Sequence, residues 1–288
     1  MEVNMNIQWY PGHMTKTRRQ IEADLKQVDA VCEIVDARIP VSSRNPDIDA
    51  ICGNKPRIIV FNRMDLADPA ATKRWMEYFR SKGIAAVATD CKSRKGISDF
   101  QPAVRSVLKE KLERDAARGM KRPLRVMVVG IPNVGKSTLI NQISGRKGAK
   151  AENRPGVTRG KQWVTVDNGL LLLDTPGILW PKFEDPEVGM MLAYTGAVKE
   201  NVMDTEELAC RLMEHLWQRY PQAIQSRYGI DDPEDISGYG LLQAAGRKRG
   251  FLLARGEIHT ERMAKVLLEE YRSGKLGRFT MEAPEETV

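Results

Sequence analysis

The feature that most constrains this chain is the segment GIPNVGKST at residues 130–138. It follows LRVMVV, an apolar run typical of a buried strand. Its last two residues are also the first two of STLINQI, whose apolar spacing indicates a helix. In that setting the pattern GxxxxGK[ST] predicts a phosphate-binding loop, because glycines let successive backbone N–H groups point inward and the helix N-terminus adds its positive dipole end. We expect Lys136 to reach the β and γ phosphates of a nucleotide and Ser137 to ligate Mg²⁺. The loop residues that we assign to nucleotide binding are Asn133, Val134, Gly135, Lys136, Ser137 and Thr138.

The remainder of the first 180 residues predicts an α/β fold with a mostly parallel sheet. Continuous apolar runs are typical of buried strands, and here they alternate with stretches of helical periodicity. The expected strands are 31–36, 57–61, 84–89, 124–129, 163–166 and 170–174, and the expected helices include 69–83 and a longer one at 97–119.

The pattern changes after about residue 181. From there on, apolar residues recur at helical spacing, as in TEELACRLMEHLWQRYP and ERMAKVLLEEYRSGK, and no strand pattern intervenes. We therefore expect two domains, a P-loop domain at residues 1–180 and an all-helical, RNA-binding domain at residues 181–288. We expect the tail APEETV, at 283–288, to be disordered.

A second motif of the phosphate side is DTPG at 174–177, directly after the expected strand LLLLD. Asp174 at the strand end is placed to hold the Mg²⁺ shell through water, and the Gly177 amide is placed to sense a γ-phosphate. Thr158, in the intervening RPGVTRG, would close over the metal when that phosphate is present. We assign Lys136, Thr158 and Gly177 to the hydrolysis step.

P-loops serve ATP and GTP alike, so the base has to be assigned separately. NRMD follows the expected strand RIIVF, and the Asp65 carboxylate can accept two hydrogen bonds, matching the N1–H and N2–H of guanine; adenine offers no such pair. Asn62 would tie this loop to the phosphate loop, and Arg63, where Lys is usual, would stack on the base. The next strand ends in TDCKS, and there we assign Thr89, Asp90 and Cys91 to a loop that contacts the guanine O6.

The order of these motifs is unusual. GTPases commonly carry the phosphate loop first and the base-reading motifs last, whereas here NRMD and TDCKS come first. The same sheet can be built by joining the old ends and cutting elsewhere, since domain termini often lie close together. The new break in the chain order falls just after DTPG, so the DTPG segment leads directly into the helical region. We expect order or disorder in DTPG to be able to reorient that region.

The net charge and the hydropathy of the chain indicate which kinds of partner it can bind. A formal net charge of +7 favours a polyanion, because Lys and Arg release counterions from phosphate backbones. No apolar run is long enough to cross a bilayer and the start lacks the apolar stretch of a secretory signal, so we expect a cytoplasmic protein with no membrane partner. We further expect a monomer. The four cysteines are scattered, without the spacing of a zinc site.

Together with the permuted order, the stretches WYPGHMTKTRR, DARIPVSSRNP and GLLQAAGRKRGFL make the chain resemble the ribosome biogenesis GTPase A family of circularly permuted GTPases. The resemblance covers nearly the whole chain. It implies a GTP hydrolase that binds GTP and GDP and acts late in assembly of the large ribosomal subunit. It further implies contact with the RNA and proteins of the large-subunit precursor, and faster hydrolysis on that particle.

Two positions bear on how such an enzyme would hydrolyse GTP. Many GTPases place a Gln after DTPG to orient the attacking water, but Ile178 stands here and cannot hydrogen-bond. The resemblance implies that His13, in PGHM, takes this role, although a His in such a turn also fits a structural or ribosome-contacting role. Asn133 resembles the residue with which some GTPases recruit K⁺ beside the phosphates.

Several basic groups could face RNA, although each run by itself is also typical of a solvated helix face. No aromatic stacking motif of the RNP type is present, so we expect recognition of backbone and shape. The candidates are Lys16, Arg18, Arg19, Lys109, Lys111, Lys121, Arg122, Arg247, Lys248 and Arg249.

Two other functions stay open at this point. A nucleotide-gated RNA-binding scaffold with incidental hydrolysis would carry the same motifs and the same charge. A P-loop ATPase or small-molecule kinase would carry the phosphate loop, but NRMD at its strand end argues against it.

Overall fold

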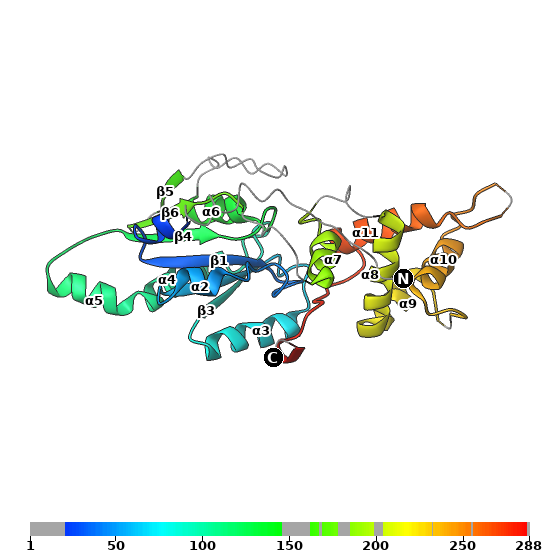
Figure 1. The fold of residues 1–288 in the computed structure, drawn as a ribbon, viewed down its shortest axis with the longest axis horizontal. Helices are drawn as coiled ribbons and strands as arrows, with labels where there is room; N and C mark the ends of the chain where they lie inside the picture. Colours follow the sequence, from blue (N-terminus) through cyan, green and yellow to red (C-terminus); the bar gives the residue numbers. More distant parts are fainter. Residues whose placement is uncertain are drawn as a thin grey trace. The chain divides into compact units, whose positions relative to one another are not determined.

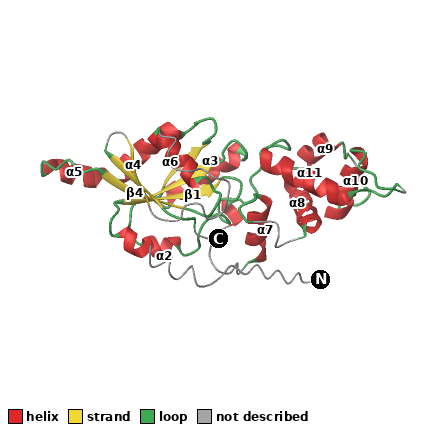
Figure 2. Cartoon of the chain, turned by 90° about the horizontal axis from the view of Figure 1, so that it is seen from above, coloured by secondary structure: helices red, strands yellow, loops and turns green. Residues whose placement is uncertain are grey.

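The computed structural model describes residues 21–145, 162–166, 169–177, 185–198, 204–231, 233–254 and 256–286. The chain divides into two compact units, and each is described by itself. The sheet unit comprises Gln8–Phe183 and Glu282–Val288, and the helical unit comprises Met1–Ile7 and Glu184–Met281. Figure 2 shows the strands gathered in the first unit. Six residues discussed above lie outside the described ranges: His13, Lys16, Arg18, Arg19, Thr158 and Ile178.

The sheet unit is built on a six-stranded sheet in the order β3-β2-β1-β4-β6-β5. β1 pairs in parallel with both β2 and β4, and the pairs β2–β3 and β4–β6 are parallel as well. The edge strand β5 runs antiparallel to β6. The mostly parallel α/β sheet predicted from the sequence is therefore confirmed. The strands are β1 (Ala30–Asp36), β2 (Arg57–Asn62), β3 (Ala85–Thr89), β4 (Leu124–Val129), β5 (Gln162–Val166) and β6 (Leu170–Asp174).

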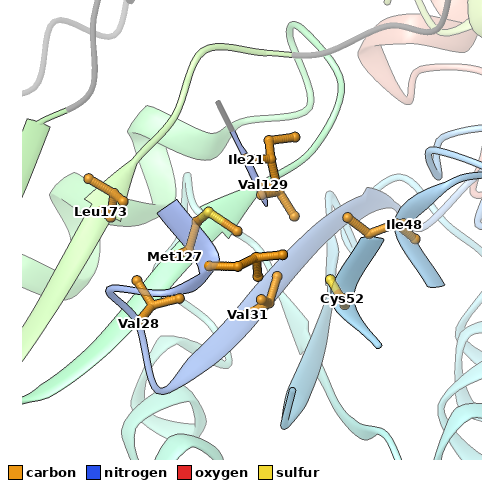
Figure 3. Packing of buried hydrophobic residues seen from close by; sticks show 9 residues of the cluster. Ile21, Val28, Val31, Ile48, Cys52, Met127, Val129 and Leu173 are labelled. Atoms are coloured by element: carbon orange, nitrogen blue, oxygen red, sulfur yellow. The ribbon is translucent and has the colours of Figure 1, made fainter. Parts of the chain in front are cut away.

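Apolar packing covers both faces of the central strand, since every residue of β1 is buried. On one face, Val31 packs with Met127 of β4 and Leu173 of β6, as Figure 3 shows. Val35 lies four residues after Val31 and therefore on the same face of the strand, and it packs with Trp75 of α3. The helices of this unit are α2 (Ile48–Cys52), α3 (Pro69–Ser81), α4 (Phe100–Val107), α5 (Lys109–Ala117) and α6 (Lys136–Ser144), with the 3-10 helices η1 (Ile97–Asp99) and η3 (Pro284–Glu286).

Two expectations about this unit are wrong. The single helix expected at 97–119 is divided into η1, α4 and α5, and Leu108 between the last two has φ −106° and ψ 16°, outside helical values. Leu108 is buried whereas α5 buries no residue, so no apolar face holds α5 in line with α4. Part of the tail expected to be disordered, Pro284–Glu286, instead forms η3, which packs against α3, and Figure 1 shows this segment beside that helix. Residues 287–288 lie outside the described ranges.

The helical unit packs around α8. Leu208, Leu212 and Leu216 lie four residues apart on α8 and are fully buried, as expected for the core-facing stripe of a helix. α8 contacts α7, α9, α10 and α11. Within the described residues, no helix is long and apolar enough to span a membrane. The helices are α7 (Pro186–Tyr194), α8 (Thr205–Arg219), α9 (Pro221–Tyr228), α10 (Gly238–Lys248) and α11 (Thr260–Ser273).

A buried carboxylate on α11 joins three elements of the helical unit. Glu270 accepts hydrogen bonds from Arg227 and Tyr228 of α9 and from Arg249 at the end of α10. The hydrogen bonds from Arg227, reinforced by those from Tyr228 and the charge of Arg249, lower the pKa of Glu270 to about 2 against the opposing effect of burial. Arg249 also lies over the ring of Tyr228. It therefore has a structural role inside the unit that the sequence did not predict.

We expect the Glu270→Gln variant to destabilise the helical unit at neutral pH by about 1–3 kcal/mol, because the amide leaves buried donors without a matching charge. The pKa of Glu270 is lowered on folding, so its stabilisation is present above pH 4.5 and is lost as the pH falls toward 2. Urea unfolding followed by circular dichroism at several pH values measures both effects. The exposed neighbour Glu269 provides the control, and equal stability of the Glu269→Gln and Glu270→Gln variants would contradict the prediction.

Candidate nucleotide-binding site

The phosphate loop connects β4 to α6, as its sequence predicts. Gly135 precedes the helix with φ +102°, and a Cβ there would lie 2.3 Å from the Asn62 side chain, so only glycine fits. The Lys136 ammonium is nearly buried and donates to the carbonyl oxygens of Gly130, at 3.0 Å, and Ile131, at 2.8 Å. The loop thus curls around the cation that is expected to meet the phosphates.

The DTPG motif lies against this loop. β6 runs parallel to β4 with Asp174 in register with Val128, and the Thr175 hydroxyl donates to the Val128 carbonyl at 2.7 Å. A Cβ on Gly177 would lie 2.9 Å from the Lys136 ammonium and equally close to the backbone of Pro132. This close approach requires glycine at the end of DTPG and places that motif against the phosphate loop.

Burial changes the pKa of Lys136 and of Asp174 more than either charge changes the pKa of the other. Burial lowers the pKa of Lys136 to about 8, although the Asp174 carboxylate acts in the opposite direction. Burial likewise raises the pKa of Asp174, while the charge of Lys136 and a hydrogen bond from Ser137 lower it. A site with these properties favours a polyanionic ligand and a cation, because both would restore full ionisation of the pair.

The loops after β2 and β3 meet the phosphate loop at the same edge of the sheet. The Asn62 amide nitrogen donates to the Val134 carbonyl at 2.8 Å, which confirms the link between the two loops that the sequence predicted. The Thr89 hydroxyl donates to the Asn62 oxygen at 3.3 Å, and the Met64 N–H donates to the Thr89 carbonyl at 3.1 Å. NRMD and TDCKS therefore form one connected surface, in which Asp65 is half-buried.

Arg63 makes a second link to the phosphate loop. Its guanidinium donates to the Asn133 carbonyl at 2.6 Å, and both residues have φ +60°, an unusual backbone region for residues other than glycine. Stacking of the Arg63 stem on a base stays a prediction. The Asp90 carboxylate accepts from the Lys92 N–H at 2.8 Å, and Cys91 is buried. The TDCKS loop is therefore held by a hydrogen bond to its own backbone.

Asp36 and Arg38 belong to this network, although no sequence motif predicted a role for them. Arg38 is fully buried, and its Nε and Nη2 donate to the two Asp36 oxygens at 3.0 and 2.8 Å. Asp36 also lies 3.6 Å from the Arg63 guanidinium. Burial opposes ionisation of Asp36, but the two arginines outweigh it and lower its pKa. The position of Asp36 at the carboxyl end of β1, between the strands that carry the two loops, is the signal that could have identified it.

Comparison with known proteins identifies the chain. Residues 125–223 match the family described as 50S ribosome-binding GTPase. The chain is 48% identical to Ribosome biogenesis GTPase A of Priestia megaterium over 98% of both chains, and 45% identical to the protein of that name in Bacillus cereus over 98% of this chain and 95% of the other. The chain belongs to the ribosome biogenesis GTPase A family. It is a GTP-hydrolysing enzyme.

The structural comparison agrees with this assignment. A GDP-bound structure of TM YlqF has a TM-score of 0.63 and 28% identity, and the match covers 93% of this chain and all of the other. The segment 125–223 begins at β4 and contains the phosphate loop and DTPG, but NRMD and TDCKS lie before it. In this member of the ribosome biogenesis GTPase A family, the half that carries NRMD and TDCKS therefore precedes the half that the GTPase family description covers.

We expect binding of GDP to weaken about tenfold between pH 7 and pH 9, because Lys136, with its pKa lowered to about 8, must regain a proton when phosphates bind beside it. Calorimetric titrations at pH 9 in two buffers of different ionisation enthalpy should show net proton uptake. The Lys136→Arg variant stays charged at both pH values and is the control. Equal proton uptake by this variant would show that another group titrates.

Proposed function

We propose that this GTPase binds the precursor of the large ribosomal subunit in the cytoplasm as a monomer, promotes a late assembly step, and hydrolyses GTP faster on that particle. The observation that carries the proposal is the full-length similarity to proteins named Ribosome biogenesis GTPase A, together with the match to a family described as 50S ribosome-binding. The net charge of +7 supports an RNA-rich partner.

Magnesium fits the residues at the phosphate side of the site. The Asp174 Oδ1 atom is buried and has no hydrogen-bond partner among the residues that the structure describes, and the Ser137 hydroxyl bonds to the same carboxylate. Ser137 would ligate Mg²⁺ directly, Asp174 would hold its water shell, and the ion would neutralise phosphate charge. Three further roles are proposed from the sequence alone. Thr158 would be a further Mg²⁺ ligand, Asn133 would recruit K⁺, and His13 would orient the attacking water.

The base contact is proposed for Asp65. Asn62 and Arg63, its neighbours in NRMD, already bind the backbone of the phosphate loop, so Asp65 is held at a set position relative to the phosphates. A carboxylate there accepts from both N–H groups of guanine. Thr89, Asp90 and Cys91 would supply the adjoining backbone contact.

We expect the Asp65→Asn variant to lose most of its affinity for GDP, by about 100-fold, and to gain affinity for xanthosine diphosphate. An amide can donate to the C2 carbonyl of xanthine but cannot accept both guanine N–H groups. Competition binding with the two nucleotides measures the exchange of preference. The exposed Asp99, in η1 and outside the NRMD motif, provides the Asp99→Asn control. Undiminished GDP preference in the Asp65→Asn variant would remove this residue from base recognition.

The RNA-facing surface is proposed for the end of α10. Arg247 and Lys248 are exposed there, whereas Arg249 turns inward to Glu270 and is therefore withdrawn from the candidates. Leu252 and Leu253, 57% and 44% exposed, directly follow this basic turn. In the sheet unit, Lys109, Lys121 and Arg122 are exposed, but Lys111 is paired with Asp115.

We expect purified large subunits to raise the rate of GTP hydrolysis at least about tenfold, and small subunits to have no effect. The same assay with Na⁺ in place of K⁺ should be slower. Co-sedimentation with a non-hydrolysable GTP analogue should weaken in the Lys248→Glu variant and not in Lys73→Glu, an equal charge change on the exposed face of α3. Binding without any stimulation of hydrolysis would favour the alternative of a nucleotide-gated scaffold.

A further inference from the structure

The C-terminal segment returns to the sheet unit and is fixed there by one carboxylate. The helical unit ends at Met281, and the next residue, Glu282, already belongs to the sheet unit. The Glu282 carboxylate accepts from the backbone N–H of Val41 at 2.5 Å, from that of Ser42 at 3.0 Å, and from the Ser42 hydroxyl. Three donors of one loop therefore converge on a single side chain that lies 240 residues further along the chain.

The backbone of Glu282 is held as well. Its carbonyl oxygen accepts from the indole N–H of Trp75 at 3.0 Å, and Trp75 is fully buried in the core of α3. η3, which begins two residues later, packs against α3, and Figure 1 shows this last segment of the chain running beside that helix. The carboxylate is thus presented to the loop from a rigid support.

The loop that Glu282 binds begins at Asp36. The Asp36 N–H donates to the Ser43 hydroxyl oxygen at 2.9 Å, and that hydroxyl donates to the Ile39 carbonyl at 2.6 Å. These bonds close the 36–43 loop on itself directly beside the two residues that Glu282 binds. Burial raises the pKa of Glu282, the hydrogen bonds from Ser42 and Val41 oppose this rise, and the charge of Asp36 adds a smaller increase.

Asp36 in turn connects this loop to the nucleotide site. Its carboxylate faces the Arg63 guanidinium at 3.6 Å, and Arg63 donates to the Asn133 carbonyl of the phosphate loop. Arg63 is a long side chain in an unusual backbone conformation, so its position depends on the groups that hold its guanidinium. A continuous series of contacts therefore runs from Glu282 through the 36–43 loop and Arg63 to the phosphate loop.

We propose that Glu282 is a positioning residue of the nucleotide site, which acts through the 36–43 loop and Arg63 on the phosphate loop. Loss of its carboxylate leaves the Val41 and Ser42 donors without an acceptor, and the loop must rearrange to find new partners. Asp36 then no longer holds Arg63 against Asn133, and bound nucleotide is released faster.

The test compares release of a fluorescent GDP analogue from the full-length Glu282→Ala and Glu285→Ala variants. Glu285 lies in the same segment, but it is exposed, and among the described residues it pairs with Arg74 at the surface, at 3.9 Å. We expect release from Glu282→Ala to be at least about threefold faster than from the wild-type protein, and release from Glu285→Ala to be unchanged. Thermal unfolding checks that each variant is folded at the assay temperature. Unchanged release from a folded Glu282→Ala protein, whatever its melting temperature, would overturn the proposal.

A double-variant cycle separates positioning from a stabilising role. If Glu282 acts through Arg63, adding Glu282→Ala to Arg63→Ala should cause no further acceleration of release. Fully additive effects would overturn the proposed route. Should Glu282→Ala not fold, Trp75→Phe removes the hydrogen bond to the Glu282 carbonyl and keeps an aromatic ring in the core. That variant should accelerate release in the same direction, and unchanged release would again count against the proposal. The experiment needs no ribosomal particle.

Discussion

In the sheet unit, β1 pairs in parallel with both β2 and β4, and this pairing places the loops of the candidate nucleotide site. In a parallel sheet the carboxyl ends of all strands meet at one edge, and the loops that leave them share a surface. NRMD, TDCKS, the phosphate loop and DTPG follow β2, β3, β4 and β6 in that manner. β1 lies between β2 and β3, whose loops carry NRMD and TDCKS, and β4 and β6, whose loops carry the phosphate loop and DTPG. Its burial on both faces therefore holds the two halves together.

This constraint explains why the order of motifs can be permuted without loss of the site. The contacts that join the two halves, from Asn62 to Val134 and from Arg63 to Asn133, depend on which strands are neighbours and not on which strand comes first. Permutation does change what the chain connects. The segment after DTPG enters the helical unit, and the chain comes back to the sheet unit at Glu282. In the chain, the phosphate side of the sheet unit is therefore followed by the helical unit, and Glu282, the first residue after the helical unit, is hydrogen-bonded to the 36–43 loop within the sheet unit.

Much of the fold followed from local patterns. Strong apolar runs located the strands, and strand–loop–helix context located the phosphate loop, because backbone geometry and phosphate binding impose residue types at short spacing. The long helix at 97–119 was predicted wrongly since helical periodicity alone does not show where burial ends, and α5 buries nothing. Part of the tail was predicted wrongly for the opposite reason. Pro284–Glu286 read as an acidic, solvated end, and the sequence does not show that Glu282, just before the tail, is held by Val41, Ser42 and Trp75.

By itself, the sequence determined the class of fold, the family, and the residue types expected to meet phosphate and guanine, because these reside in short motifs whose chemistry is local. Only the tertiary structure decided which of those residues hold one another. Asp36 and Glu282 entered the network through contacts between segments far apart in the chain, and Arg38 entered it through its neighbour Asp36. Arg249 left the candidate RNA surface through its bond to Glu270. The physical reason is that a charged side chain has the same local signature whether it faces water or is buried against an opposite charge, and packing alone distinguishes the two.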